Sequence, residues 1–383
     1  MPRIVEHRRD YVFTLASGVA VSFYSFVILK LVLVMYGEQA LEFFAVLKRY
    51  QAVLLPLMLL GFGVTLPKYL AMGQLSKEML AACLALVGGA FCVTLLVFWA
   101  FWGEYWLAVP LSLPALAAGF LYSVARGQSK FLLGGGINIV FLVFIPSLLF
   151  LFFSDLASYI VSSSIFAVLA FLITVLLYRR ALPKPNSDLS VSKLSFFYTS
   201  FCRVPGDFLN QAILFLPVQY YLFLGDTASA AHLSVALSFA LAAAIPLKPV
   251  STILLVKVSM VAPDVKANRK AMLYCCLIGL AFASIYRALT WVVNRVYFDS
   301  SDFLHVLNVL APVVLFYSIY VLVRSYVDAL FSGPVLTYVN LVSLLIGGAF
   351  CLLLSAEPWA FVCVSYGCAA FLVVALVLVK KNA

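Results

Sequence analysis

Charged side chains within the long apolar stretches are the residues of this sequence best able to do chemistry. A charge in hydrocarbon is costly, so each is a candidate for a functional site. The set consists of Lys30, Lys48, Arg49, Arg203, Asp207, Lys248, Arg287, Arg324 and Asp328. Because cations outnumber acids in this set, we expect the membrane interior to be net positive and to bind an anion.

Two pairs in this set have the i,i+4 spacing of neighbours on one helix face. Arg203 with Asp207, and Arg324 with Asp328, can therefore neutralise each other locally. Local pairing leaves a role in ligand binding open for both pairs.

The cations outside these two pairs differ in how readily they reach the membrane surface. Lys48, Arg49 and Arg287 can extend along their helices toward the lipid headgroups. Lys30 lies in VILKLVLV with no acid nearby in the sequence, and Lys248 lies between two prolines in AAAIPLKPVS. We expect Lys30 and Lys248 to line a water-filled cavity, with extension to the surface as the alternative for Lys30.

A cavity lined by cations would accept an anion that cannot cross hydrocarbon alone. Arginine forks and lysine point charges both suit a pyrophosphate. Exporters driven by protons or sodium need buried carboxylates instead, and the first apolar stretch has no acid in its interior.

Prolines beside these charges are candidate hinges. Proline removes a backbone hydrogen bond and can bend a helix. Pro246 and Pro249 flank Lys248, and Pro205-Gly206 separates the members of the first charged pair. Proline is also common in membrane helices, so simple tolerance is the alternative.

The composition places these charges in membrane helices. The chain has 383 residues, of which 65% are hydrophobic and 10% charged, against roughly 45–50% and about 25% in soluble domains. Apolar runs of more than about 20 residues favour helices over the alternating strands of a barrel. The net charge of +10 is typical of basic cytoplasmic loops, and no polar region is large enough for a nucleic-acid site.

The sequence predicts an all-α integral membrane protein with about twelve spans in two six-helix bundles around a central cavity. The amino-terminal bundle is 1–180, the cytoplasmic linker 181–194 and the carboxy-terminal bundle 195–383, as in transporters with repeated halves. The predicted spans are 11–36, 43–72, 79–102, 105–125, 131–153, 156–178, 195–224, 228–258, 271–297, 303–332, 334–355 and 358–379.

Loop charges orient these spans. Most of the 25 basic residues fall in segments that the span count assigns to the cytoplasm, whereas the outer segments carry acids such as Glu38, Glu104, Asp226 and Asp299. This alternation continues along the whole chain. Both termini are therefore predicted to be cytoplasmic, and the first span is predicted to be an uncleaved helix.

Catalysis, cofactors and metals are not expected. The eight cysteines fall in predicted spans without the spacing of a metal site, and no phosphate-binding glycine loop is present. His7, His232 and His305 lie at or outside predicted helix ends, and the outer loops are too short for a catalytic domain. A membrane-embedded polysaccharide enzyme remains a third alternative.

Three segments carry more specific patterns. They are LLPLMLLGFGVTLPKYLA (54–71), FYTSFCRVPGDFLNQAILFLPVQYYL (197–222) and LVRSYVDALFSGPVLTYVNL (322–341). All three resemble parts of the bacterial O-antigen and polysaccharide flippases of the multidrug/oligosaccharidyl-lipid/polysaccharide exporter superfamily. The best match is the Arg-x-Pro-Gly-Asp sequence that runs from Arg203 to Asp207.

This resemblance implies a flippase that moves an undecaprenyl-pyrophosphate-linked oligosaccharide across the bacterial inner membrane by alternating access. Its partners would be this lipid-linked substrate, membrane lipids and other polysaccharide-assembly proteins. A cation-coupled small-molecule or drug exporter of the same superfamily is the main alternative. A carboxylate lining the amino-terminal bundle would favour it.

Overall fold

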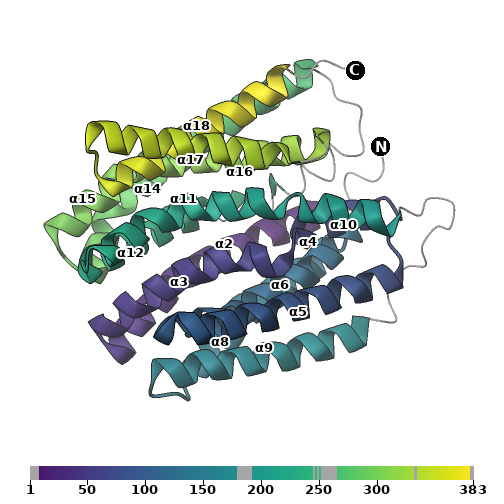
Figure 1. The fold of residues 1–383 in the computed structure, drawn as a ribbon, viewed down its shortest axis with the longest axis horizontal. Coiled ribbons are helices and arrows are strands. Elements are labelled where there is room, and N and C mark those ends of the chain that lie inside the picture. The colour runs from purple at the N-terminus through teal and green to yellow at the C-terminus, as the bar shows by residue number, and fades with distance from the viewer. Residues whose placement is uncertain are drawn as a thin grey trace. The chain divides into compact units, whose positions relative to one another are not determined.

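The fold is helical throughout the part of the chain that the structure describes (Figure 1). The computed structural model describes residues 8–178, 192–244, 246–247, 250–251, 265–331 and 334–379. The all-α fold class is therefore confirmed. Lys248 and Pro249, predicted as a cavity lysine and a hinge, lie outside the described residues.

The helices of the first half follow one another closely along the chain. They are α2 (Arg8–Tyr36), α3 (Glu38–Leu59), α4 (Phe62–Ala71), α5 (Lys77–Phe101), the 3₁₀-helix η1 (Gly103–Leu107), α6 (Ala108–Gly127), α7 (Phe131–Ile139), the π-helix η2 (Val140–Phe144), α8 (Ile145–Phe150) and α9 (Leu156–Tyr178).

The second half has the same character. Its helices are α10 (Lys193–Phe201), α11 (Val204–Phe223), α12 (Thr227–Ala244), α14 (Val265–Tyr297), α15 (Ser301–Val309), α16 (Ala311–Leu330), α17 (Val335–Leu354) and α18 (Pro358–Val379).

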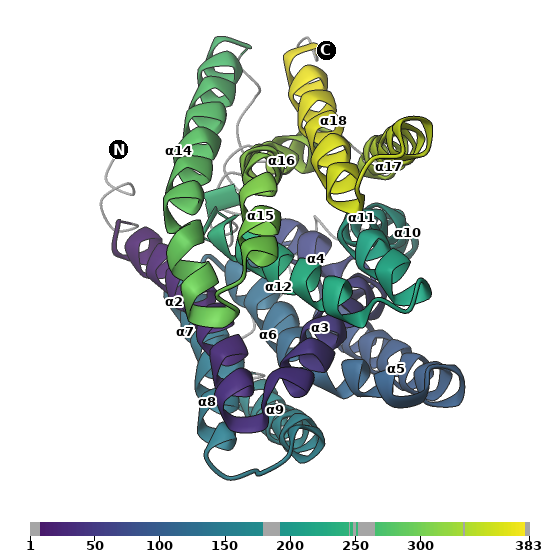
Figure 2. The same cartoon turned by 90° about the vertical axis from the view of Figure 1, so that its left-hand side faces the viewer.

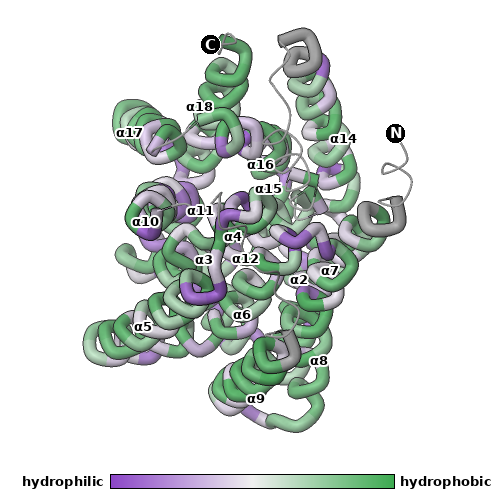
Figure 3. The backbone as a smooth tube through the Cα atoms, turned by 90° about the vertical axis from the view of Figure 1, so that its right-hand side faces the viewer, coloured by the Kyte–Doolittle hydropathy of each residue, from purple (hydrophilic) through white to green (hydrophobic). Residues whose placement is uncertain are grey.

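Most of these helices are long and apolar enough to cross a membrane. Among the described residues, ten helical segments meet this condition when η1 with α6, α7 with η2 and α8, and α15 with α16 each count as one, and the bent pair α3–α4 gives an eleventh. The other predicted span, 195–224, is helical as α10 and α11 but is less apolar, because α11 carries Asp207, Asn210, Gln211 and Gln219. Figure 3 shows long hydrophobic stretches along α5 and α9, which expose much of their apolar surface.

Polar side chains set the first residue of several helices. Each accepts a hydrogen bond from the backbone N–H three residues further on, and so satisfies an amide that the helix leaves without a partner. These residues are Ser76, Asp155, Ser192, Asp226 and Ser300. They begin α5, α9, α10, α12 and α15.

Prolines interrupt three predicted spans that the sequence analysis treats as single helices, namely 131–153, 195–224 and 303–332. A proline cannot donate to the carbonyl four residues earlier, and its ring collides with that group. Pro205 lies just after the break between α10 and α11, and Pro312 just after the break between α15 and α16. Before Pro146, the helix widens into a π-helical turn instead.

The chain folds into two compact units that share three helices. Unit 1 comprises residues 1–21 and 47–208, and unit 2 comprises residues 22–46 and 209–383. Their borders fall within α2, α3 and α11. The division into bundles 1–180 and 195–383 around a central cavity remains a prediction, and most of the linker 181–194 lies outside the described residues.

Each unit has one central helix. In unit 1, α6 packs against α4, α7 and α9, and small residues such as Ala117 and Ala118 allow this close packing. In unit 2, α16 packs against α12, α14 and α18 (Figure 2). The Tyr366 hydroxyl there donates to the backbone carbonyl of the buried Asn210, at 3.0 Å.

Helix ends that are predicted to share a membrane face lie together within each unit. In unit 1, Lys193 and Glu78 are 3.8 Å apart, and both are predicted to be cytoplasmic. In unit 2, the Tyr221 hydroxyl lies 3.4 Å from the Glu357 carboxylate. Tyr221 is near the predicted outer end of the span 195–224, and Glu357 is predicted to be outside. This arrangement agrees with the alternation of the loop charges. The orientation in the membrane remains a prediction.

Candidate functional site

A sharp bend separates α3 from α4 in unit 1. The two helices meet at an angle of 43°, and the residues between them, Leu60 and Gly61, have positive φ angles of 51° and 76°. Side chains disfavour this backbone region, and glycine adopts it without strain. The second predicted span, 43–72, is therefore two helices and not one.

The break between α10 and α11 lies directly against this bend. A Cβ atom on Gly61 would lie 2.9 Å from the carbonyl carbon of Ser200 and would overlap its oxygen. The hydroxyls of Thr65 and Ser200 are hydrogen-bonded at 2.8 Å, and both residues are fully buried. Two discontinuous helices thus meet break to break, which is the arrangement that forms binding sites in many transporters.

Arg203 and Asp207 lie at this junction. Arg203 immediately precedes α11 and is buried, and its backbone carbonyl accepts the hydrogen bond of the Asp207 N–H at 3.0 Å. The predicted hinge residues Pro205 and Gly206 are in the first turn of α11. A Cβ on Gly61 would be 3.4 Å from that of Arg203. The junction therefore holds one arginine and one aspartate beside the amino-terminal ends of α4 and α11, and the Asp207 carboxylate lies in the first turn of α11.

Buried charge is distributed unequally between the two units. Among the described residues of unit 1, the buried charged side chains are Arg49, Arg126 and Arg203, which are 5%, 9% and 9% exposed. The one buried carboxylate of the described chain is Asp328, in unit 2. The buried charges of unit 1 are therefore all cations among the described residues.

Arg126 is a buried cation that the sequence analysis assigns to a cytoplasmic loop. Its guanidinium carbon lies 4.8 Å from the centre of the Tyr122 ring, in a cation–π contact. Its Nε atom makes no hydrogen bond within the described structure. The tyrosine four residues earlier was the available signal, because residues spaced i,i+4 share a helix face.

Lys48 and Arg49 lie midway along α3 and not near a helix end. Arg49 is buried in unit 1, and Lys48 is half-buried. From the middle of α3, the Lys48 and Arg49 side chains must extend further to reach the lipid headgroups than they would from a helix end.

Lys30 contacts the carboxy-terminal end of α14 in unit 2. Its ammonium group donates to the Val296 carbonyl at 2.6 Å and lies 5.9 Å from the centre of the Tyr297 ring. The Tyr297 hydroxyl donates in turn to the Phe26 carbonyl, one turn before Lys30. The last carbonyls of a helix lack partners within the helix, and a cation there also offsets the helix dipole.

We expect Lys30→Met to lower the free energy of unfolding by about 1–2 kcal/mol, because it removes a charged hydrogen bond to a helix end. Lys30→Arg should retain most of that stability. The measurement is the melting temperature in detergent, beside transport normalised to folded protein. Unchanged melting with reduced transport in the methionine variant would instead place Lys30 at the substrate.

The other predicted site residues have different surroundings. Arg324 and Asp328 form an ion pair on α16, with 3.5 Å between Nε and Oδ2, and their side chains are 20% and 6% exposed. Arg287 lies on the exposed face of α14 beside Leu289. Pro246 is buried just after α12. Of the two predicted pairs, Arg324 and Asp328 thus form an ion pair within unit 2, and Arg203 and Asp207 are joined by a backbone hydrogen bond within unit 1.

Comparisons with known proteins define the fold. No protein-family model and no curated protein matches the sequence. Similar solved structures include an outward-facing multidrug resistance MATE family transporter of the MOP superfamily, with 13% identity and a TM-score of 0.72 over 96% of this chain and 94% of the other. The eukaryotic MATE transporter AtDTX14 matches with 15% identity and a TM-score of 0.71 over 98% and 96%.

A third solved structure extends this likeness to a bent conformation. The Vibrio cholerae MATE transporter VcmN in the bent form matches with 17% identity and a TM-score of 0.61 over 98% of this chain and 96% of the other. The chain therefore has the fold of the MATE transporters of the MOP superfamily. The likeness does not extend specifically to the flippases named in the sequence analysis.

Proposed function

We propose that this protein is a multi-pass membrane transporter that exports an anionic small molecule by alternating access. The similarity to MATE transporters over nearly the whole chain supports the transport mechanism. The observation that supports an anionic substrate is the set of buried arginines in unit 1, which has no buried carboxylate among the described residues. Guanidinium groups bind carboxylate and phosphate groups with paired hydrogen bonds.

The coupling ion would act in unit 2. A coupling proton or sodium ion needs a buried carboxylate, and Asp328 is the buried carboxylate of the described chain. Its partner, Arg324, lies on the preceding turn. A cation that binds Asp328 would therefore compete with Arg324. This competition would link ion binding to the conformation of α16.

A lipid-linked oligosaccharide flippase of the bacterial inner membrane is the second candidate. It is supported by the resemblance of Arg203 to Asp207 to the flippase pattern, and by the buried position of Arg203 at the two helix breaks. In this case the anion would be the pyrophosphate of the carrier lipid. Proteins of polysaccharide assembly would be partners, and both termini would be cytoplasmic.

Transport of two fluorescent dyes of similar size, one anionic and one cationic, tests the first candidate in proteoliposomes. We expect the anionic dye to move at least about tenfold faster. Arg49→Ala should reduce this rate about tenfold and Arg49→Lys should restore part of it, because the charge is kept and the fork is lost. The control is Arg295→Ala, which removes an exposed arginine beside Trp291. Equal rates for the two dyes would refute an anionic substrate.

Deletion of the gene separates the two candidates. Accumulation of undecaprenyl-pyrophosphate-linked oligosaccharide, with loss of surface polysaccharide, would identify the flippase. Normal surface polysaccharide with reduced efflux of anionic dyes would identify the small-molecule exporter.

A further inference from the structure

We propose that α4 and α10 form a latch that must open in each transport cycle. The two helices pack against each other (Figure 1). The latch consists of Phe62, Thr65 and Tyr69 on α4, with Phe196 and Ser200 on α10. The proposal rests on the transport function proposed above. It assigns to a particular contact the role of holding one side of the protein closed.

The closed latch joins aromatic packing to one buried hydrogen bond. Phe196 is fully buried, and its ring stacks on that of Phe62 at 6.0 Å and meets the edge of Tyr69 at 5.3 Å. One turn further on, the hydroxyls of Thr65 and Ser200 are bonded at 2.8 Å. The aromatic contacts and the hydroxyl pair thus lie along one line of contact between α4 and α10.

The short length and one-sided burial of α10 suit a movement of this helix as a rigid body. It has nine residues, and it ends at the break before Arg203. Only the stripe with Phe196 and Ser200 is buried, whereas Leu194, Tyr198 and Phe201 are exposed. A rotation about the break would separate α10 from α4 without disturbing the hydrogen bonds within α11.

α4 is the part of the latch that stays in place when α10 moves. It begins at the bend of Leu60 and Gly61 and packs against the central helix α6. Glycine at position 61 allows the backbone of α10 to approach the bend closely, because a side chain there would overlap Ser200. The two breaks therefore lie side by side, where the movement of one helix end directly changes the surroundings of the other.

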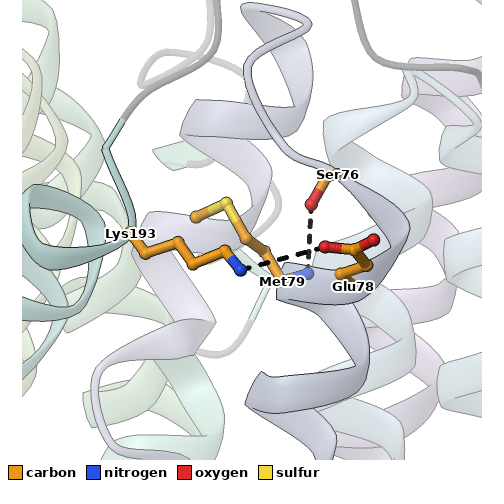
Figure 4. Close-up of polar contacts among 4 residues, drawn as sticks. All are labelled: Ser76, Glu78, Met79 and Lys193. Atoms are coloured by element: carbon orange, nitrogen blue, oxygen red, sulfur yellow. Dashed lines mark hydrogen bonds and ion pairs between the residues drawn. The ribbon is translucent and has the colours of Figure 1, made fainter.

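A weak ion pair between α10 and α5 lies beside the latch. Figure 4 shows the Lys193 ammonium group directed at the Glu78 carboxylate, 3.8 Å away. The two side chains are 70% and 82% exposed. Exposed ion pairs of this kind contribute little, so this contact would not prevent the latch from opening.

A disulfide across the latch tests the proposal. Thr65→Cys with Ser200→Cys is introduced into a variant whose eight native cysteines are replaced. Oxidation should reduce dye transport more than tenfold, and a reductant should restore it. A protease site placed in the linker reports the bond, since the cross-linked fragments stay together. The control pair is Thr290→Cys with Asn308→Cys, which joins the neighbouring helices α14 and α15 and should leave transport unchanged.

Labelling of a single cysteine at position 200 provides a readout that needs no known substrate. A membrane-impermeant maleimide is applied to inside-out and right-side-out vesicles. Reaction on one side only would show that the latch opens, and lack of dye movement in the same vesicles would then refute the proposed substrate alone. No labelling on either side, or full transport with the disulfide formed, would overturn the latch.

Discussion

Replacement of Gly61 by alanine is expected to remove most of the folded protein. The backbone there has a φ of +76°, and the new Cβ would overlap the carbonyl oxygen of Ser200. A residue held in a disfavoured backbone region costs about 1–3 kcal/mol by itself. While α10 is packed against α4, the overlap adds to this, because the neighbouring atom belongs to the backbone and not to the end of a flexible side chain.

Gly63→Ala is the matched control for this substitution. Gly63 lies two residues further on, in the first turn of α4, and a Cβ there would meet no atom within 4 Å. Its melting temperature should equal or exceed that of the parent, since alanine favours helix over glycine by about 1 kcal/mol. Equal melting temperatures for Gly61→Ala and the parent protein would show that the two helix breaks do not meet as described.

Removal of the Arg324 side chain is expected to lower the free energy of unfolding by about 3–5 kcal/mol, because it removes the cation that lies 3.5 Å from a buried carboxylate. The Asp328 side chain is only 6% exposed. The double substitution Arg324→Met with Asp328→Asn should recover most of the loss, since neither side chain of the pair is then charged. Unfolding in denaturant, followed by intrinsic fluorescence in mixed micelles, gives the three free energies.

The exposed pair of Lys193 and Glu78 provides the comparison. Lys193→Met should cost less than about 1 kcal/mol, because both side chains remain largely in water. If Arg324→Met proved as mild as Lys193→Met, groups other than Arg324 would stabilise the Asp328 carboxylate in the folded protein.

Apolar patterning was sufficient to predict the helices themselves. Runs such as those of α5, α9 and α18 have few charges, so length alone identifies them. The same reasoning located the i,i+4 pair of Arg324 and Asp328, because both members lie on one helix. These are local features, and local spacing determines them.

Contacts between distant segments could not be predicted in this way. Lys30 bonds to Val296, which is 266 residues away, and the expectation of a cavity lysine did not consider a helix end as its partner. Gly61 had no distinct signal, since its role depends on the position of Ser200. Pro205 and Pro312 did signal helix breaks, but a proline within an apolar run fits a kink as well as a break.

The predicted span 195–224 covers both α10 and α11. A prediction of one continuous helix there does not reveal that α10 is a separate short helix that packs against α4. Arg126 was missed for a related reason. It lies in the last turn of α6, and the i,i+4 spacing to Tyr122 indicates a contact within the helix but not the burial of both residues between helices.

The polar character of α11 also bears on how the protein is made. A segment that is less apolar than its neighbours partitions less readily from the translocon into lipid on its own. The ribosome completes α4 well before it reaches α10, so the surface that buries Phe196 already exists when Lys193 to Phe223 emerge. Integration of this segment should therefore depend on the first half of the chain, and a second half expressed alone should insert one helix fewer.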